Sequence, residues 1–215
     1  MTPTQPAAPQ PPRLDALLAA LPAAIQHWTS RDPVLADLAR QTQVEPWPAA
    51  RDPFSSLCVS IIHQQVSLAA GRTIYGRFAA LVGDVTPANV MAVGEGIGAA
   101  GLSRQKTGYI LDLAASAGDG TLDGLDSLSD AEVTARLTQV KGIGVWSAKM
   151  FLLFQLGRLD VCPWEDLGVR LAVARFYGVP EAQAARWLRD EAQPRWAPYN
   201  SVAARVLWAA RRDEK

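Results

Sequence analysis

A pair of glycines and a nearby acidic residue are the residues of this sequence best suited to chemistry. Gly142 and Gly144 flank one isoleucine just before an apolar run, and Asp166 lies in an apolar, aromatic stretch further along. Glycines so spaced allow positive φ angles and close approach of the backbone, and a helix start directs unpaired N–H groups outward, which suits a phosphate. Each feature also has a plain structural explanation, since glycines suit a helix–helix turn and aspartate suits an N-cap. Together, at this spacing, they favour a functional site.

Helices are the elements expected to position these two loops. Apolar residues recur at helical spacing, and no alternating run is long enough to predict a strand, so the sequence predicts an all-α protein. Ser129 and Glu132 form a capping box for a helix that leads into the glycine turn. The helix after the turn is expected over residues 145–156. Further helices are expected over residues 14–27, 33–39, 54–65, 68–81, 87–92, 104–117, 167–177, 181–191 and 199–211.

The chain is expected to form one domain after a short tail. Residues 1–12 are rich in proline and polar residues and predict disorder, whereas residues 13–215 predict a helical domain that contains the glycine turn at about 137–157. Cys58 and Cys162 are too few for a disulfide framework or a four-cysteine iron–sulfur cluster, and they fit a reducing compartment. With no apolar run long enough to cross a bilayer and no signal peptide, we expect a cytoplasmic protein.

The charge is distributed unevenly along the chain. A formal net charge of zero argues against a nucleic-acid partner. From residue 136 to residue 212, however, there are 12 Lys or Arg and 6 Asp or Glu residues, and this segment contains the glycine turn. The surplus predicts a local basic face, although arginines on solvated helix faces would give the same count.

Four stretches, taken in order, resemble known sequence motifs. They read IIHQQVS at 61–67, GLSRQK at 101–106, LTQVKGIGVWSA at 137–148 and DVCPWEDLGVR at 160–170. Together they resemble the helix-hairpin-helix DNA glycosylase superfamily, and most of all its 3-methyladenine DNA glycosylase II branch, over roughly residues 53–212. The resemblance implies a helix-hairpin-helix glycosylase fold with two helical subdomains and the active cleft between them. It also implies a core-only member, because too few residues precede Phe54 for the N-terminal sheet domain that this branch often carries.

The resemblance assigns the catalytic role to an aspartate. Asp166 matches the catalytic aspartate of the family, which stabilises the oxocarbenium-like state of glycosidic cleavage and orients water. Glu165 is the rival acid, and we interpret it as a charge at a helix start. Trp146 stands where bifunctional relatives carry a catalytic lysine, which implies that no Schiff base forms.

The same resemblance implies a base pocket and a wedge. Trp208 and Trp146 match aromatic residues beside the aspartate, where electron-rich rings would favour cationic alkylpurines, and Met150 stands where some relatives have a tyrosine. Gln65 matches the residue that fills the space left by a flipped base, and Gln64 is expected to contact nearby bases. Core packing of the tryptophans and a burial or capping role for the glutamines are the structural alternatives.

The hairpin is expected to hold the DNA backbone. Gly142 and Gly144 would seat a phosphate, and Lys141, which replaces the usual proline, would contact a phosphate or be merely exposed. Lys149 is expected to face solvent. By resemblance alone, the carbonyls of Thr138, Val140 and Gly142 would hold a monovalent cation, Na⁺ or K⁺, and no other cofactor is required.

These observations predict a monofunctional DNA glycosylase that hydrolyses the N-glycosidic bond of alkylated purines, of the 3-methyladenine and 7-methylguanine type, in base excision repair. Its partner would be double-stranded DNA with damaged bases and not a membrane, and it would act as a monomer, nucleoid-associated if bacterial. One alternative is a glycosylase for deaminated or oxidised bases. Another is a non-catalytic helix-hairpin-helix DNA-binding protein, which would need neither a carboxylate nor a wedge.

Overall fold

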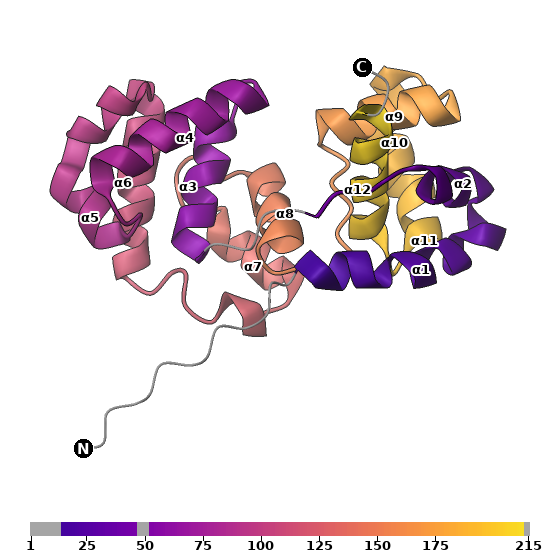
Figure 1. The fold of residues 1–215 in the computed structure, drawn as a ribbon. Coiled ribbons are helices and arrows are strands. Elements are labelled where there is room, and N and C mark those ends of the chain that lie inside the picture. The colour runs from indigo at the N-terminus through magenta and orange to yellow at the C-terminus, as the bar shows by residue number, and fades with distance from the viewer. Residues whose placement is uncertain (1–13, 47–51, 213–215) are drawn as a thin grey trace.

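A computed structural model of the protein describes residues 14–46 and 52–212, and within these ranges the secondary structure is helical, without strands (Figure 1). The expected tail at residues 1–12 lies outside the described residues. None of the described helices combines the length and apolar character that crossing a bilayer requires. The α-helices are α1 (Leu14–Arg31), α2 (Pro33–Gln41), α3 (Pro53–His63), α4 (Leu68–Val82), α5 (Pro87–Val93), α6 (Arg104–Gly118), α7 (Asp130–Leu137), α8 (Val145–Phe154), α9 (Leu167–Tyr177), α10 (Glu181–Trp187), α11 (Gln193–Trp196) and α12 (Asn200–Arg212). Short turns of other helix types are η1 (Gly94–Ala100), η2 (Leu125–Ser127) and η3 (Leu188–Ala192).

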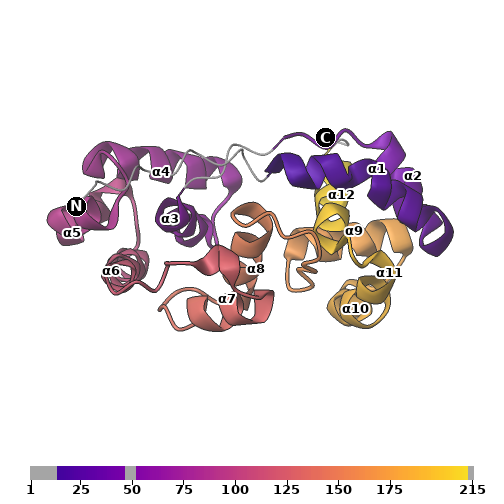
Figure 2. The ribbon, with the colours of Figure 1, turned by 90° about the horizontal axis from the view of Figure 1, so that it is seen from below.

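The helices form two groups, each around its own hydrophobic core (Figures 1 and 2). The first core is built by α3 to α8 and contains Ile61, Phe78 and Ile110. The second core joins α1 and α2 to α9–α12 and contains Trp28 and Trp196. The chain therefore begins in one group, passes through the other and returns.

Helix α8 belongs to both groups. Phe151 and Leu152 are buried in the first core, whereas the next residue, Leu153, is buried in the second. Successive helix residues point in directions about 100° apart, so a helix with few polar side chains can pack on two sides. This explains the nearly continuous apolar run after the glycine turn, and it places α8 between the two cores.

The hairpin joins α7 to α8 as expected, with one difference in how its glycines are used. Ser129 and Glu132 form the predicted capping box at the start of α7. Gly142 has a φ angle of 85°, whereas Gly144 has a φ angle of −92° and is the extended N-cap of α8. Only the first glycine therefore needs the left-handed region. It also packs against Tyr109 of α6, because a Cβ atom built on Gly142 would lie 2.3 Å from the tyrosine ring.

Several helix boundaries differ from the expected ones: α1 runs to Arg31 instead of residue 27, and α8 ends at Phe154 instead of residue 156. The helix expected over 54–65 ends at His63, because the C-cap Gln64 has a non-helical ψ angle of 130°, and Gln65 then has a φ angle of 55°. The helix expected over 181–191 changes into the π-helical turn η3 after Trp187.

Gly142→Ala should destabilise the protein much more than Gly144→Ala, which costs only the modest preference for glycine over alanine at an N-cap. The first change adds left-handed strain of about 1–2 kcal/mol and a clash with Tyr109 of about 1–3 kcal/mol, so we expect roughly 2–5 kcal/mol in total and a fall in melting temperature on the order of 10 °C. A Cβ atom built on Gly144 would have no neighbouring atom within 4 Å. Thermal unfolding of both variants measures the difference, and equal melting temperatures would contradict the packing described here.

Candidate active site

The carboxylate of Asp166 is the centre of the candidate site. Asp166 is the N-cap of α9, and its Oδ1 accepts a hydrogen bond of 2.9 Å from the backbone N–H of Val169. Trp146 Nε1 donates to Oδ2 at 3.0 Å, and Trp208 Nε1 donates to Oδ1 at 2.8 Å. An ionised carboxylate only accepts hydrogen bonds and has about four lone-pair positions. These three N–H donors therefore suit an ionised carboxylate and leave it one further position.

The two indoles come from different helices. Trp146 is in the first turn of α8 and Trp208 is near the end of α12, and both are half-buried. The Trp208 ring stacks on Phe154, with ring centroids 5.6 Å apart and an interplanar angle of 21°. The structure thus brings Trp146, Trp208 and Asp166 together, as predicted. Met150, one turn after Trp146, is buried with 8% of its surface exposed.

Gly168 is part of this arrangement and was not predicted from the sequence. A Cβ atom at Gly168 would lie 3.0 Å from Oδ1 of Asp166 and 3.0 Å from Nε1 of Trp208. This separation is tighter than nearly all real Cβ contacts. The missing side chain therefore allows the indole to reach the carboxylate. The available signal was a glycine in the first turn of a predicted helix, where glycine is unfavourable without a packing reason.

Lys149 is buried, which makes the expectation that it faces solvent wrong. Only 9% of its surface is exposed, and its Nζ donates to the carbonyl of Cys162 at 3.1 Å and to both carboxylate oxygens of Glu165 at 2.9 Å. It also lies over the Trp164 ring, 3.0 Å from the centroid. Burial lowers the pKa of Lys149, and the hydrogen bond and charge of Glu165 oppose that shift. Lys149 follows Trp146 by three residues, so both face the loop before α9.

The contact with Lys149 also shows the structural role of Glu165, the rival acid. Glu165 is the counter-ion of a buried lysine rather than a free charge at a helix start. Because both of its oxygens accept from Lys149, its carboxylate is engaged, whereas the adjacent Asp166 accepts only from N–H groups that do not carry charge. The geometry therefore favours Asp166 as the reactive acid of the pair.

The predicted wedge and hairpin residues lie next to each other. Gln64 donates from Nε2 to the carbonyl of Gly142 at 2.8 Å, which ties the turn after α3 to the hairpin. Gln65 is exposed and has the left-handed backbone noted above. Lys141 is also exposed and forms a loose ion pair of 3.4 Å with Asp112. Their roles on DNA stay predictions.

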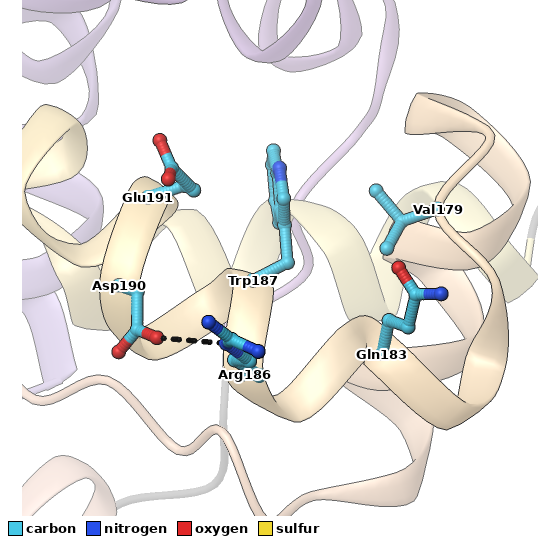
Figure 3. A pocket seen from close by; sticks show the side chains of 6 residues that line it. All are labelled: Val179, Gln183, Arg186, Trp187, Asp190 and Glu191. Atoms are coloured by element: carbon cyan, nitrogen blue, oxygen red, sulfur yellow. Dashed lines mark ion pairs between the residues drawn. The ribbon is translucent and has the colours of Figure 1, made fainter.

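A cavity of about 300 Å³ lies away from this site, along α10 and η3 (Figure 3). One side of it carries the ion pair between Arg186 and Asp190, whose atoms are 3.4 Å apart. None of its lining residues is a predicted site residue. The lining residues are Val179, Gln183, Arg186, Trp187, Asp190 and Glu191.

One protein family matches well over half of the chain. The family described as "HhH-GPD superfamily base excision DNA repair protein" matches residues 58–198, a span that includes the hairpin and Asp166. This chain belongs to that superfamily.

Individual relatives agree with this assignment. DNA-3-methyladenine glycosylase 1 of Schizosaccharomyces pombe is 30% identical over 169 residues, which are 74% of this chain and 72% of that protein. The structure of 3-methyladenine DNA glycosylase Mag1 from the same yeast, in complex with abasic DNA, has a TM-score of 0.75 at 26% identity and covers 86% of this chain and 95% of that one. DNA-3-methyladenine glycosidase of Bacillus halodurans has a TM-score of 0.74 at 33% identity, with 89% and 91% covered. The all-α helix-hairpin-helix glycosylase fold predicted from the sequence is confirmed.

Gly168→Ala should reduce activity without reducing stability. The added methyl group would push Trp208 away from Asp166, and we expect base release from methylated DNA to fall on the order of tenfold, because small misplacements at a reacting centre are costly. Alanine in place of a helical glycine contributes about 1 kcal/mol, which offsets the crowding. The indole N–H resonance of Trp208 should also shift in a ¹H–¹⁵N spectrum.

The matched control is Gly108→Ala. Gly108 lies within α6, and a Cβ atom there meets nothing within 4 Å. This variant should keep both the rate and the resonance. An unchanged rate in the Gly168 variant would show that the contact between Trp208 and Asp166 is not needed.

Proposed function

We propose that this protein is a monofunctional DNA glycosylase that hydrolyses the N-glycosidic bond of alkylated purines, such as 3-methyladenine and 7-methylguanine, in double-stranded DNA. The observation that carries the proposal is the carboxylate of Asp166, held by two indole N–H groups and one backbone N–H group. A passive DNA-binding protein has no use for an acid fixed in this way. The naming of its relatives as 3-methyladenine DNA glycosylases supports the same reaction.

The geometry suits stabilisation of a positive charge. Cleavage of the bond between a base and C1′ passes through an oxocarbenium-like state, and Asp166 would stabilise this state electrostatically and orient the attacking water. Its donors are fixed by α8, α9 and α12, so little reorganisation is required during the reaction. Alkylated purines are already cationic and leave readily, so one carboxylate suffices without a separate general acid.

The indoles would select the base as well as hold the acid. Trp146 and Trp208 use their N–H groups on Asp166, which fixes their electron-rich rings beside it. A cation over an indole face gains about 0.5–2 kcal/mol, and the cationic lesions would gain this where normal bases do not. Met150, on the same helix as Trp146, would line the pocket as an apolar, adaptable side chain.

Strand cleavage is not expected, because a Schiff base requires a free amine. Trp146 stands at the position of the catalytic lysine of bifunctional relatives. The nearest lysine along α8, Lys149, is buried and bonded to Glu165, which leaves its amine unsuited to attack on a sugar.

The hairpin and the turn after α3 would engage DNA. Backbone N–H groups of Gly142 and Gly144 at the start of α8 would seat a phosphate, and exposed Lys141 would add a charge. Gln65 would enter the stack where the damaged base has left, with Gln64 beside it. Phosphate binding of this kind depends on few charged side chains. A chain of zero net charge would therefore still be able to bind DNA.

The hairpin carbonyls would also hold a monovalent cation. Val140 accepts from the N–H of Ile143 at 3.1 Å, and Gly142 accepts from Gln64, so each carbonyl keeps a second lone pair. Backbone carbonyls are suitable ligands for K⁺ and Na⁺. With Thr138 they would place a positive charge near the phosphate. Within the described residues, no cluster of His, Cys, Asp or Glu could hold a catalytic metal.

Asp166→Asn should lower the rate of base release on the order of 10²-fold or more, because it removes a preorganised charge at the reacting centre. The measurement uses a panel of duplexes that each carry one alkylated, deaminated or oxidised base, with abasic sites scored after a single turnover. Affinity for the uncleaved duplex should be retained, since the hairpin is untouched.

Glu165→Gln distinguishes the two acids in the same assay. It should retain more activity than the Asp166 variant, because its role is to pair with Lys149. Near-normal base release by Asp166→Asn would move the catalytic role to Glu165. Release from deaminated or oxidised duplexes alone would change the substrate class, and release from none would leave a DNA-binding protein.

The reaction should leave intact abasic sites. We expect strand breaks from lesion-containing duplex only after treatment with alkali, and no covalent trapping of the protein on DNA by borohydride. Gel electrophoresis with and without alkali measures the first, and a mobility shift of the protein measures the second. Breaks without alkali together with trapping would show a Schiff base and contradict the monofunctional assignment.

A further inference from the structure

The turn between α3 and α4 has an unusual conformation. Gln65, the predicted wedge, has a φ angle of 55°, and in the described part of the chain no other residue except glycine has a positive φ angle. Its side chain is exposed and, among the described residues, makes no hydrogen bond. Left-handed backbone costs about 1–2 kcal/mol for a residue of this kind and persists only where surrounding contacts impose it.

One side of this turn is held by a lysine from α6. Lys106 lies in the first turn of α6, after the N-cap Ser103, and its Nζ donates to the carbonyl of Ile62 at 2.7 Å and to the carbonyl of Gln64 at 2.6 Å. These carbonyls belong to the end of α3, where the helix leaves its last acceptors unpaired and where a cation is favourable. The side chain of Lys106 is half-buried, and this burial lowers its pKa.

The other side of the turn is held by the hairpin. Gln64 donates to the carbonyl of Gly142, so its main chain is bonded to α6 and its side chain is bonded to the loop before α8. Gln65 follows directly and is left to project, with Val66, 37% exposed, next to it. The contacts therefore fix the residue before the wedge on two sides and leave the wedge itself free.

We propose that Lys106 is a positioning residue for base extrusion: its ammonium group holds the turn that presents Gln65, so that the wedge is formed before DNA binds. This inference rests on the proposed function, because a wedge has a use only if a base leaves the stack. A lysine that merely capped α3 would contribute to stability alone. The two roles differ in which substrates a substitution affects.

The test compares two substrates that contain the same lesion. In one duplex the lesion is paired, and in the other it lies within an unpaired bubble, where extrusion needs no wedge. Lys106→Met keeps the apolar stem and removes the ammonium group. We expect single-turnover base release from the paired duplex to fall on the order of tenfold, and release from the bubble to change less than about twofold.

Two further variants make the result specific. Gln65→Ala should show the same difference between substrates, and the double variant should be no slower than Gln65→Ala alone, because both act on one step. Arg104→Met removes a positive charge two residues from Lys106, where no hydrogen bond to the turn exists among the described residues, and it should not show the difference.

The outcomes separate this inference from the proposed function. Equal losses on both substrates, or additive losses in the double variant, would show that Lys106 only stabilises the fold and would overturn the inference. If Lys106→Met does not fold, the same comparison with Lys106→Gln, which keeps a hydrogen-bond donor, decides. Absence of base release by the wild-type protein from either substrate would instead refute the proposed function.

Discussion

The hydrogen bonds to the carboxylate of Asp166 are the constraint on which the site depends. A half-buried acid needs donors, and here they come from three helices: Trp146 on α8, Val169 on α9 and Trp208 on α12. The first of these helices contributes to both hydrophobic cores, and the other two belong to the second. The position of the two carboxylate oxygens of Asp166 therefore depends on the packing of both helix groups. Gly168 shows how closely this is arranged, since even a methyl group there would intrude.

Two lysines of the protein hold loops instead of facing solvent fully. Lys149 holds the loop before α9 through Glu165 and the carbonyl of Cys162, and Lys106 holds the turn after α3 through two carbonyls. Both lysines are thereby removed from the set of residues that could attract DNA. In the proposed function, backbone N–H groups, which carry no formal charge, would bind the phosphates instead, so a net charge of zero is compatible with DNA binding.

Local sequence patterns predicted most of the helices but not the contacts that join them. The capping box at Ser129, the turn at Gly142 and the N-cap at Asp166 were all predictable, because each depends on residues a few positions apart. The N-cap role of Asp166 is confirmed, and the same oxygen also accepts from Trp208, so capping α9 does not exclude the catalytic role, which stays a prediction. The burial of Lys149 was predicted wrongly, because its partner Glu165 is 16 residues away and on another element.

The return of the chain to its starting group of helices has a consequence for synthesis on the ribosome. The first core uses one continuous stretch, α3 to α8, and can form while later residues are still being added. The second core joins partners as distant as Trp28 and Trp196, 168 positions apart, and it closes only after α12 has emerged. Trp208 lies in that last helix. The carboxylate of Asp166 therefore gains its final donor at the end of translation, and a nascent chain that exposes the hairpin does not yet hold the complete set of donors to this acid.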